Sequence, residues 1–339
     1  MKKIIWGTTA VVLLVLLGGC AFLSGLRRKQ TSDESIVFWD NSLLQGVNKV
    51  TNDGINKAYA RISPDGTKLL YCEAEKTERN ISGGGSYDLW NVVLLRNASV
   101  AAKTKLISDY AFEPAWYEDS SRFVYVTSED NVNKIVRSAI TGGGKTYITR
   151  SSVGNLNRDY GPVVRDGVVL GYTLVQTTPV SRYQLISMRD NGTEITTLGD
   201  GRNPSWHPTE AKFVYTRDGD LYEMDFATTQ ETMLFADSEG YNVVYPSYSA
   251  DGNYIVFQKG AEAKTSGTLV SGRSRRAVVS KSSKWQIFSI KVDGTELTTL
   301  TTNNVNAFSP SLSIDGYLYF ISDASGKTEI YRARVNLGD

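Results

Sequence analysis

The feature that most constrains the fold of this chain is a unit that recurs six times along its sequence. Each unit opens beside a predicted turn, and an apolar run that ends in an aromatic residue follows. The opening residues are Ala60, Pro114, Pro162, Pro204, Pro246 and Pro310, and the aromatic residues are Tyr71, Tyr125, Tyr172, Tyr215, Phe257 and Phe320. Because the aromatic residue always lies 10 or 11 positions after the opening one, the six units are expected to share one local structure.

Each unit has the composition of a small antiparallel sheet. A second apolar pair follows every aromatic residue, and in most units a polar turn and a further apolar segment come after it. Asn191-Gly192 and Asp293-Gly294 supply the positive φ angles that tight hairpin turns require. The apolar segments are rich in Val, Ile, Tyr, Phe and Thr, as half-buried strands are. Four short antiparallel strands at a spacing of roughly 40–50 residues are typical of a β-propeller blade.

The predicted fold is therefore an all-β, six-bladed propeller over residues 35–339. Its four-stranded antiparallel blades are expected at approximately 59–108, 111–150, 158–201, 202–237, 242–302 and 307–335 plus 46–51. The last blade is split because only four residues follow Val335, too few for a fourth strand. Val50-Thr51 lies ten residues before Ala60, as Leu300-Thr301 lies ten before Pro310. We therefore expect an N-terminal strand to complete the last blade and to remove an exposed sheet edge.

The turn sequence Ser63-Pro64-Asp65-Gly66 has partial copies at residues 249–252 and 313–316. It resembles the PD40-type repeat of TolB-like propellers, and the resemblance covers roughly residues 46–335. It implies the propeller fold, but blades of this kind serve binding proteins, peptidase gates and some lyases. TolB proteins carry an α/β domain before the propeller, whereas only a short segment precedes the first unit here. The chain is therefore expected to be a stand-alone, TolB-like propeller.

The N-terminal residues predict export. Lys2 and Lys3 precede an apolar run that is short for a membrane span but suits a signal peptide. The run ends in Leu17-Gly18-Gly19-Cys20, which resembles the lipobox of bacterial lipoproteins. We expect a signal peptide at 1–19, lipidation of Cys20 and a membrane tether at 20–34. An ordinary signal peptide or an uncleaved anchor is the alternative.

These segments place the protein at the bacterial cell envelope, facing the periplasm or the outside. Ala21 after the cysteine, instead of Asp, favours the outer membrane over the inner one under the enterobacterial sorting rule. The whole chain has a formal net charge of +1, which gives no electrostatic case for binding nucleic acid. Besides Cys20, only Cys72 is a cysteine, and its apolar surroundings indicate a packed strand residue. The body is expected to be a monomer.

Long and varied connections are expected at one end of the propeller, where the second strand leads to the third and each blade leads to the next. Binding sites usually lie on such loops. The connection residues 258–284 are strongly basic, which indicates an arm for an anionic glycan, a lipid headgroup or an acidic protein, or else a solvated excursion. The candidate binding residues are Tyr110, Phe112, Arg158, Tyr160, Arg202, Tyr241 and Phe308, with Arg273, Arg275 and Arg276 in the basic connection.

The sequence offers little catalytic chemistry. His207 is the only histidine and occupies a position where other units have a turn serine, so a turn role is expected. One histidine cannot build a histidine-rich metal site, and we expect no metal, no cofactor and no catalytic residue. Asp109, Glu113 and Asp159 are carboxylates near the expected channel mouth, and a pair of carboxylates can cleave glycosidic bonds. The favoured function is therefore non-catalytic binding or scaffolding of an unidentified envelope protein. A propeller that binds or cleaves envelope glycans is the alternative.

Overall fold

The computed structural model describes residues 42–74, 87–94, 100–108, 110–129, 132–141, 144–149, 158–175, 182–263, 284–301 and 305–337. The regular elements within these ranges are β-strands. None of the described residues belongs to a helix that is long and apolar enough to cross a membrane. The predicted signal peptide, the tether and the lipidation of Cys20 lie outside the described residues.

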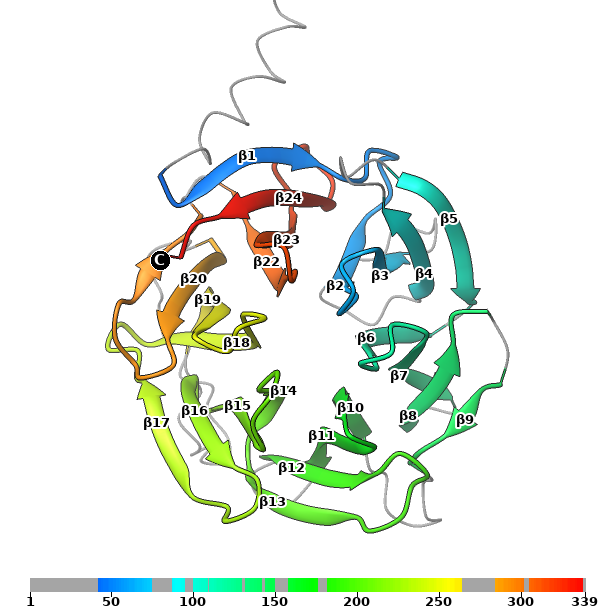
Figure 1. Ribbon diagram of the computed structural model, residues 1–339, viewed down its shortest axis with the longest axis vertical. Coiled ribbons are helices and arrows are strands. Elements are labelled where there is room, and N and C mark those ends of the chain that lie inside the picture. Colours follow the sequence, from blue (N-terminus) through cyan, green and yellow to red (C-terminus); the bar gives the residue numbers. More distant parts are fainter. Residues whose placement is uncertain are drawn as a thin grey trace, which may run out of the picture.

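In the described ranges the strands form six four-stranded antiparallel sheets around a common axis (Figure 1). Five sheets each use four consecutive strands, and the sixth combines strands from both ends of the chain. These sheets confirm the predicted all-β propeller of four-stranded antiparallel blades.

The first three consecutive sheets follow the chain from its N-terminal side. They contain β2 (Lys57–Ile62), β3 (Lys68–Ala74), β4 (Tyr87–Leu94) and β5 (Val100–Ile107); β6 (Ala111–Trp116), β7 (Arg122–Glu129), β8 (Val132–Ala139) and β9 (Thr146–Tyr147); and β10 (Arg158–Arg165), β11 (Val168–Val175), β12 (Arg182–Arg189) and β13 (Thr196–Asp200).

The remaining consecutive sheets and the composite sheet follow. The fourth contains β14 (Arg202–Trp206), β15 (Lys212–Arg217), β16 (Asp220–Asp225) and β17 (Glu231–Phe235); the fifth contains β18 (Tyr241–Tyr248), β19 (Tyr254–Ala263), β20 (Gln286–Lys291) and β21 (Thr298–Thr299). The composite sheet has the order β1 (Leu44–Lys49), β24 (Glu329–Val335), β23 (Tyr317–Ser322) and β22 (Ala307–Leu312).

The N-terminal strand closes the ring. β1 pairs antiparallel with β24, from Leu44 opposite Val335 to Lys49 opposite Tyr331. Just beyond β1, the Val50 N–H donates to the Ile330 carbonyl at 2.7 Å. This pairing covers the edge of β24, which would otherwise offer unpaired backbone groups to another chain.

Burial explains why the second strand of each sheet is so apolar. Five of the six repeated aromatic residues, among them Tyr71 and Phe257, are fully buried, and Tyr172 is 6% exposed. Both faces of these strands pack against neighbouring blades, so apolar residues follow one another instead of alternating. Cys72 fits this pattern, since it is buried and its thiol lies 3.3 Å from the Ala111 carbonyl oxygen. Its predicted role as a packed strand residue is confirmed.

The recurring turn sequence has a physical basis. The Ser63 hydroxyl donates to the Asp65 carboxylate and accepts the Lys68 N–H, which closes the turn between β2 and β3. Ser249 and Ser313 make the equivalent contacts in their blades. We call the end of the propeller that carries these turns the turn end, and the opposite end the connection end.

Candidate functional site

The innermost strand of every blade is irregular at the same point. The register of its pairing with the second strand shifts there in all six sheets. The residue at each shift has a positive φ between 49° and 56°, and these residues are Tyr59, Glu113, Gly161, Asn203, Tyr245 and Ser309. Five of the six precede a repeat proline, which has no N–H to contribute to the sheet. We call these six residues the bulge ring.

Gly161 shows how tightly the bulge ring is packed. A β-carbon at this position would lie 2.4 Å from the Tyr172 ring, and the backbone φ of +53° is itself unfavourable for most side chains. Its N–H points at the Glu113 carboxylate, with the Gly161 nitrogen 2.7 Å from Oε2. Glycine is therefore needed here for a close approach as well as for the backbone conformation.

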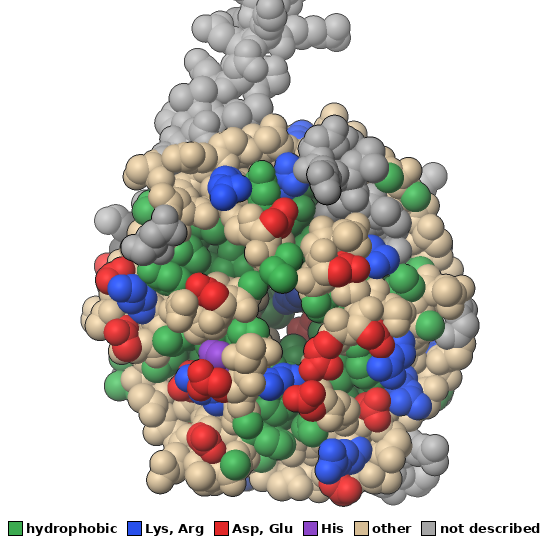
Figure 2. Space-filling view, viewed as in Figure 1, with side chains coloured by type: hydrophobic (Ala, Val, Ile, Leu, Met, Phe, Trp, Pro, Cys, Tyr) green, Lys and Arg blue, Asp and Glu red, His purple; other side chains and the backbone are tan. Residues whose placement is uncertain are grey.

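A funnel of about 410 Å³ opens from the bulge ring towards the turn end. Figure 2 looks onto this end, because the single purple side chain beside the central hollow is His207, the only histidine of the chain. The wall of the funnel is largely apolar and consists of prolines, tryptophans and aliphatic residues. They include Pro64, Pro114, Trp116, Pro162, Pro204, Trp206, Pro246, Leu312 and Ile314. Ile314 stands at the rim and is 68% exposed.

The floor of the funnel is polar and centres on Glu113. Besides the Gly161 N–H, its carboxyl receives hydrogen bonds from the Tyr172 hydroxyl at 3.4 Å and the Tyr245 hydroxyl at 3.3 Å. Burial raises the pKa of Glu113, while these donors and the nearby charge of Arg61 lower it in part. The donors come from blades on different sides of the channel, so only the closed ring brings them together.

Arg61 follows the bulge-ring residue Tyr59 by two positions, towards the turn end, and its side chain lines the funnel. Its Nη1 donates to the Ser309 hydroxyl and to the Ala60 carbonyl, both at 2.8 Å, and its guanidinium lies 6.0 Å from the centre of the Tyr245 ring. Burial lowers the pKa of Arg61, and the charges of Tyr245 and Glu113 oppose that shift. No carboxylate of the described residues lies within ion-pair distance of this guanidinium.

The candidate residues predicted from the sequence lie mainly at the connection end of the same channel. Phe112 and Tyr160 approach each other, with ring centres 6.4 Å apart, and Tyr160 stacks on Tyr172. The Arg202 guanidinium lies 5.7 Å from the centre of the Tyr183 ring. Arg158 and Phe308 are half-buried, and Tyr110 is 53% exposed. The structure therefore brings part of the predicted set together, but away from the funnel.

The basic connection is only partly described. Arg273, Arg275 and Arg276 lie outside the described residues. Lys259, at its start, pairs with Asp237 at 2.6 Å and with Glu239 at 3.3 Å, and it lies over the ring of Tyr241. Tyr241 and Lys259 thus stabilise each other within blade five, and Lys259 is not a free cation for an anionic partner.

The two described carboxylates of the predicted mouth, Glu113 and Asp159, have different surroundings. Glu113 faces the channel, whereas Asp159 is buried next to Thr149, the end of the preceding blade. Burial raises the pKa of Asp159 and the hydrogen bond with Thr149 lowers it. Glu113 therefore lines the funnel, and Asp159 is not among the residues that line it.

His207 has a turn role, as predicted. Its Nδ1 accepts the N–H of Thr209 at 3.3 Å and that of Glu210 at 2.9 Å, and its ring packs edge-on against Tyr248. Burial lowers the pKa of His207, which keeps this acceptor available. Among the described residues, no group of three or more His, Cys, Asp or Glu is arranged to hold a metal ion.

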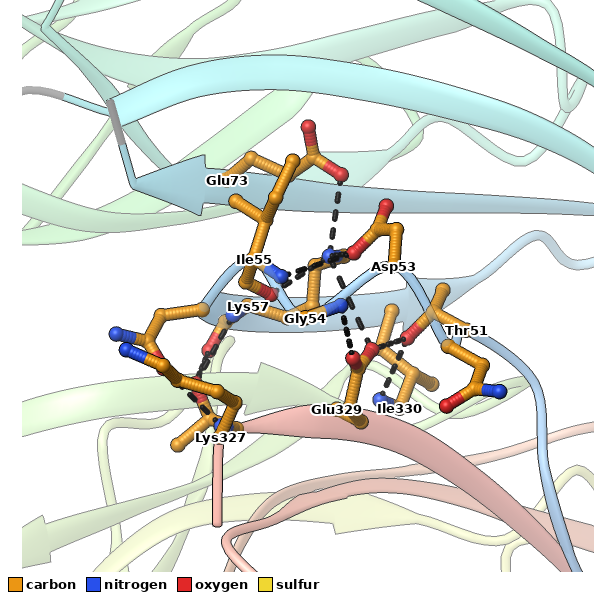
Figure 3. Close-up of polar contacts among 12 residues, drawn as sticks. Thr51, Asp53, Gly54, Ile55, Lys57, Glu73, Lys327, Glu329 and Ile330 are labelled. Carbon is orange, nitrogen blue, oxygen red and sulfur yellow. Dashed lines mark hydrogen bonds and ion pairs between the residues drawn. The ribbon is translucent and has the colours of Figure 1, made fainter. Parts of the chain in front are cut away.

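A second charged cluster lies at the ring closure and not in the funnel (Figure 3). Lys57 is fully buried there, with Glu73 at 3.2 Å, Glu329 at 3.9 Å and a short contact to Asp53. Glu329 also accepts the Thr51 hydroxyl at 2.5 Å and the Gly54 N–H at 2.8 Å (Figure 3). The cluster joins the N-terminal segment to the first and last blades, so we assign it a structural role.

Sequence reasoning missed the funnel because it looked for a site in long loops. The repeat itself was the signal that could have found it. The residues next to the opening prolines occupy the same position in every unit, so in a closed ring they all lie around the central axis. Arg61 was visible as a basic residue at a position where the other five units have Ala, Val or Ser.

The described strands form a β-propeller, the fold that the resemblance to TolB-like repeats implies. No family model matches the chain, and no curated protein matches it in sequence. Among solved structures, it is similar to a protein described as TolB from Agrobacterium tumefaciens, with 13% identity, a TM-score of 0.53 and coverage of 86% of this chain and 97% of that one. It is also similar to an oligogalacturonate lyase in complex with manganese, with 15% identity, a TM-score of 0.52 and coverage of 88% and 96%.

A luciferin-regenerating enzyme is similar as well, with 13% identity, a TM-score of 0.55 and coverage of 86% of this chain and 96% of that one. At these identities the likeness concerns the fold alone, and it includes both TolB proteins and enzymes.

Proposed function

We propose that this chain is a non-catalytic lipoprotein of the bacterial cell envelope that binds a partner protein through the funnel at its turn end. The observation that carries the proposal is the funnel itself, with an apolar wall, an exposed apolar residue at its rim and polar groups on its floor. Concave apolar sites with a few convergent polar groups are the usual form of a binding pocket.

The position of the N-terminus supports this choice of face. Leu44, the first residue of β1, pairs with Val335, and the Val335 N–H donates to the carbonyl of Gly316 in a turn of the turn end. The first described strand thus begins at the turn end, and a tether before it would lead to that end. Roughly 24 residues separate Cys20 from Leu44, and a random-coil segment of that length spans on the order of 27 Å. A lipid anchor at Cys20, in the outer membrane, would keep the funnel within reach of proteins at the membrane surface.

The proposal is tested by crosslinking the full-length protein in cells, purifying it and identifying the attached protein. Ile314→Asp places a charge on the funnel rim. Ile195→Asp is the matched control, since Ile195 is 61% exposed but belongs to an outer turn of blade three. We expect one envelope protein whose recovery falls at least tenfold in Ile314→Asp and stays unchanged in Ile195→Asp. Equal recovery with both variants would refute the funnel as the binding site.

The anchor is tested separately. Metabolic labelling with a fatty acid should mark the wild-type protein and not Cys20→Ser, and Cys20→Ser should be released from the membrane fraction. Labelling that persists in Cys20→Ser would show that the acyl chain is elsewhere, or that the chain has an ordinary signal peptide.

Glycan binding or cleavage is the second candidate, and one observation favours it. Glu113 is a carboxyl with a raised pKa in a funnel lined by Trp116 and Trp206, and tryptophan rings commonly stack on sugars. Incubation with isolated envelope glycans tests this reading. Turnover by the wild type that disappears in Glu113→Gln would establish it and displace the binding proposal.

A further inference from the structure

Three of the five N–H donors of the Arg61 guanidinium are unused by the described residues. Only its Nη1 donates to the protein, to Ser309 and Ala60, and neither Nε nor Nη2 has a partner in the described parts of the chain. Its backbone is held in place, since the Trp116 indole N–H donates to the Arg61 carbonyl at 2.9 Å. The guanidinium is thus fixed in position, with free donors in the funnel.

The nearest acidic group does not satisfy these donors. Glu113 is engaged by three other donors and lies outside ion-pair distance of Arg61. Burial also raises the pKa of Glu113, which reduces the negative charge that it places near Arg61. A half-buried guanidinium without a contacting carboxylate is costly, and an entering carboxylate can restore the missing interactions through two parallel hydrogen bonds.

The surroundings narrow the ligand further. Residues of all six innermost strands line the funnel around its axis, so a polypeptide that enters from the turn end reaches Arg61 with its chain end. Trp116 and Trp206 suit either ligand, but the rest of the funnel wall offers proline rings and the side chains of Leu312 and Ile314, which suit apolar side chains more than the many hydroxyls of a sugar.

We propose that Arg61 binds the C-terminal carboxylate of a polypeptide whose last residues enter the funnel from the turn end. This inference rests on the proposed function, because it names the part of the partner protein that the funnel takes. The apolar wall contacts the side chains of the last residues, and the Arg61 guanidinium binds the terminal carboxylate.

The experiment uses the purified full-length protein in detergent and a display library of random heptapeptides with free C-termini. Selected peptides are synthesised with a free and with an amidated C-terminus, and their affinities are measured for the wild type, Arg61→Gln and Arg61→Lys. Arg182→Gln is the matched control, since Arg182 is 54% exposed and lies at the connection end, with Asp200 3.6 Å away. Circular dichroism and thermal unfolding verify that each variant is folded.

We expect amidation to weaken binding to the wild type by about 10- to 100-fold, as loss of charge-assisted hydrogen bonds does. Arg61→Gln should weaken the free-acid peptides by a similar factor and make amidation nearly neutral. Arg61→Lys should restore part of the affinity, and Arg182→Gln should behave as the wild type. This coupling between the two changes is the specific signature of contact between Arg61 and the carboxylate.

Three results would overturn the inference: selected peptides that tolerate amidation, an amidation effect that persists in Arg61→Gln, or Arg61-dependent binding of oligogalacturonides but not of peptides. These outcomes differ from failure of the proposed function. If crosslinking to the envelope protein is lost in Ile314→Asp but is unchanged in Arg61→Gln, the funnel binds a partner and the chain-end assignment is wrong.

Discussion

Replacement of Lys57 by methionine tests whether the buried cluster at the ring closure holds the propeller together. The substitution keeps the length of the side chain but leaves Glu73 and Glu329 without their shared cation, and their side chains are only 5% and 2% exposed. Removing one partner of a buried ion pair typically costs about 3–5 kcal/mol. Glu73 keeps Lys103 at 2.5 Å, and Glu329 keeps Thr51 and Gly54, so we expect the lower end, about 3 kcal/mol.

The matched control is Lys103→Met. Lys103 contacts Asp53 and Glu73 as Lys57 does, but its side chain is 31% exposed, and such pairs contribute about 0–1 kcal/mol. Urea unfolding followed by tyrosine and tryptophan fluorescence gives the midpoints. A loss of about 3 kcal/mol should lower the midpoint by roughly 1 M, given a slope of about 3 kcal/mol/M for a domain of this size.

The loss of stability should also be confined mainly to the ring closure. Because Lys57 joins the N-terminal segment to the first and last blades, limited proteolysis of Lys57→Met should cut the N-terminal segment sooner than in the wild type. Equal midpoints for Lys57→Met and Lys103→Met would refute the reasoning, since they would show that burial of the cluster adds nothing to closure.

Three further predictions concern single positions. Gly161→Ala should lower the unfolding midpoint and weaken funnel binding together, because its β-carbon would meet the Tyr172 ring at 2.4 Å; a fully stable variant in thermal unfolding would contradict the close approach. Partial burial would raise the pKa of Asp65, but hydrogen bonds from Ser63, Thr67 and Lys68 lower it to about 2. The ionised carboxyl therefore stabilises the fold above its unfolded pKa near 4, and this contribution is lost as the pH falls towards 2. Asp65→Asn should therefore flatten the acid limb of a stability–pH curve, and an unchanged curve would count against it. His207→Phe should lower the free energy of unfolding by about 1–2 kcal/mol, because the N–H groups of Thr209 and Glu210 lose their acceptor. Crosslinking to a partner should stay intact. A variant that is stable but no longer captures the partner would give His207 a binding role.

The strand pattern of this protein was accessible from the sequence because it is encoded locally. A turn such as Ser63-Pro64-Asp65-Gly66 closes through contacts between residues two to five positions apart. The match between Val50-Thr51 and Leu300-Thr301 is a different signal, since it reflects one interaction that recurs from blade to blade and, for Thr51, joins the two ends of the chain. The Thr51 hydroxyl accepts the N–H of Ile330, and the Thr301 hydroxyl accepts the N–H of Ile287.

The site could be predicted only in part, because its residues come from different blades. Phe112 and Tyr160 of the predicted set lie close together, whereas Lys259, at the start of the basic connection, is held by Asp237. Nothing local distinguishes a lysine in a basic connection that finds a carboxylate from one that does not.

The sequence alone determined the strands, the turns and the order of the chain within each blade, since short-range periodicity and turn chemistry specify these. Only the tertiary structure decided which side chains share the axis. Arg61, Glu113 and Tyr245 lie far apart in the sequence and become neighbours because the ring is closed and each innermost strand bulges at the same point. The burial that leaves Arg61 with unused donors, and that raises the pKa of Glu113, exists only once all the blades surround them.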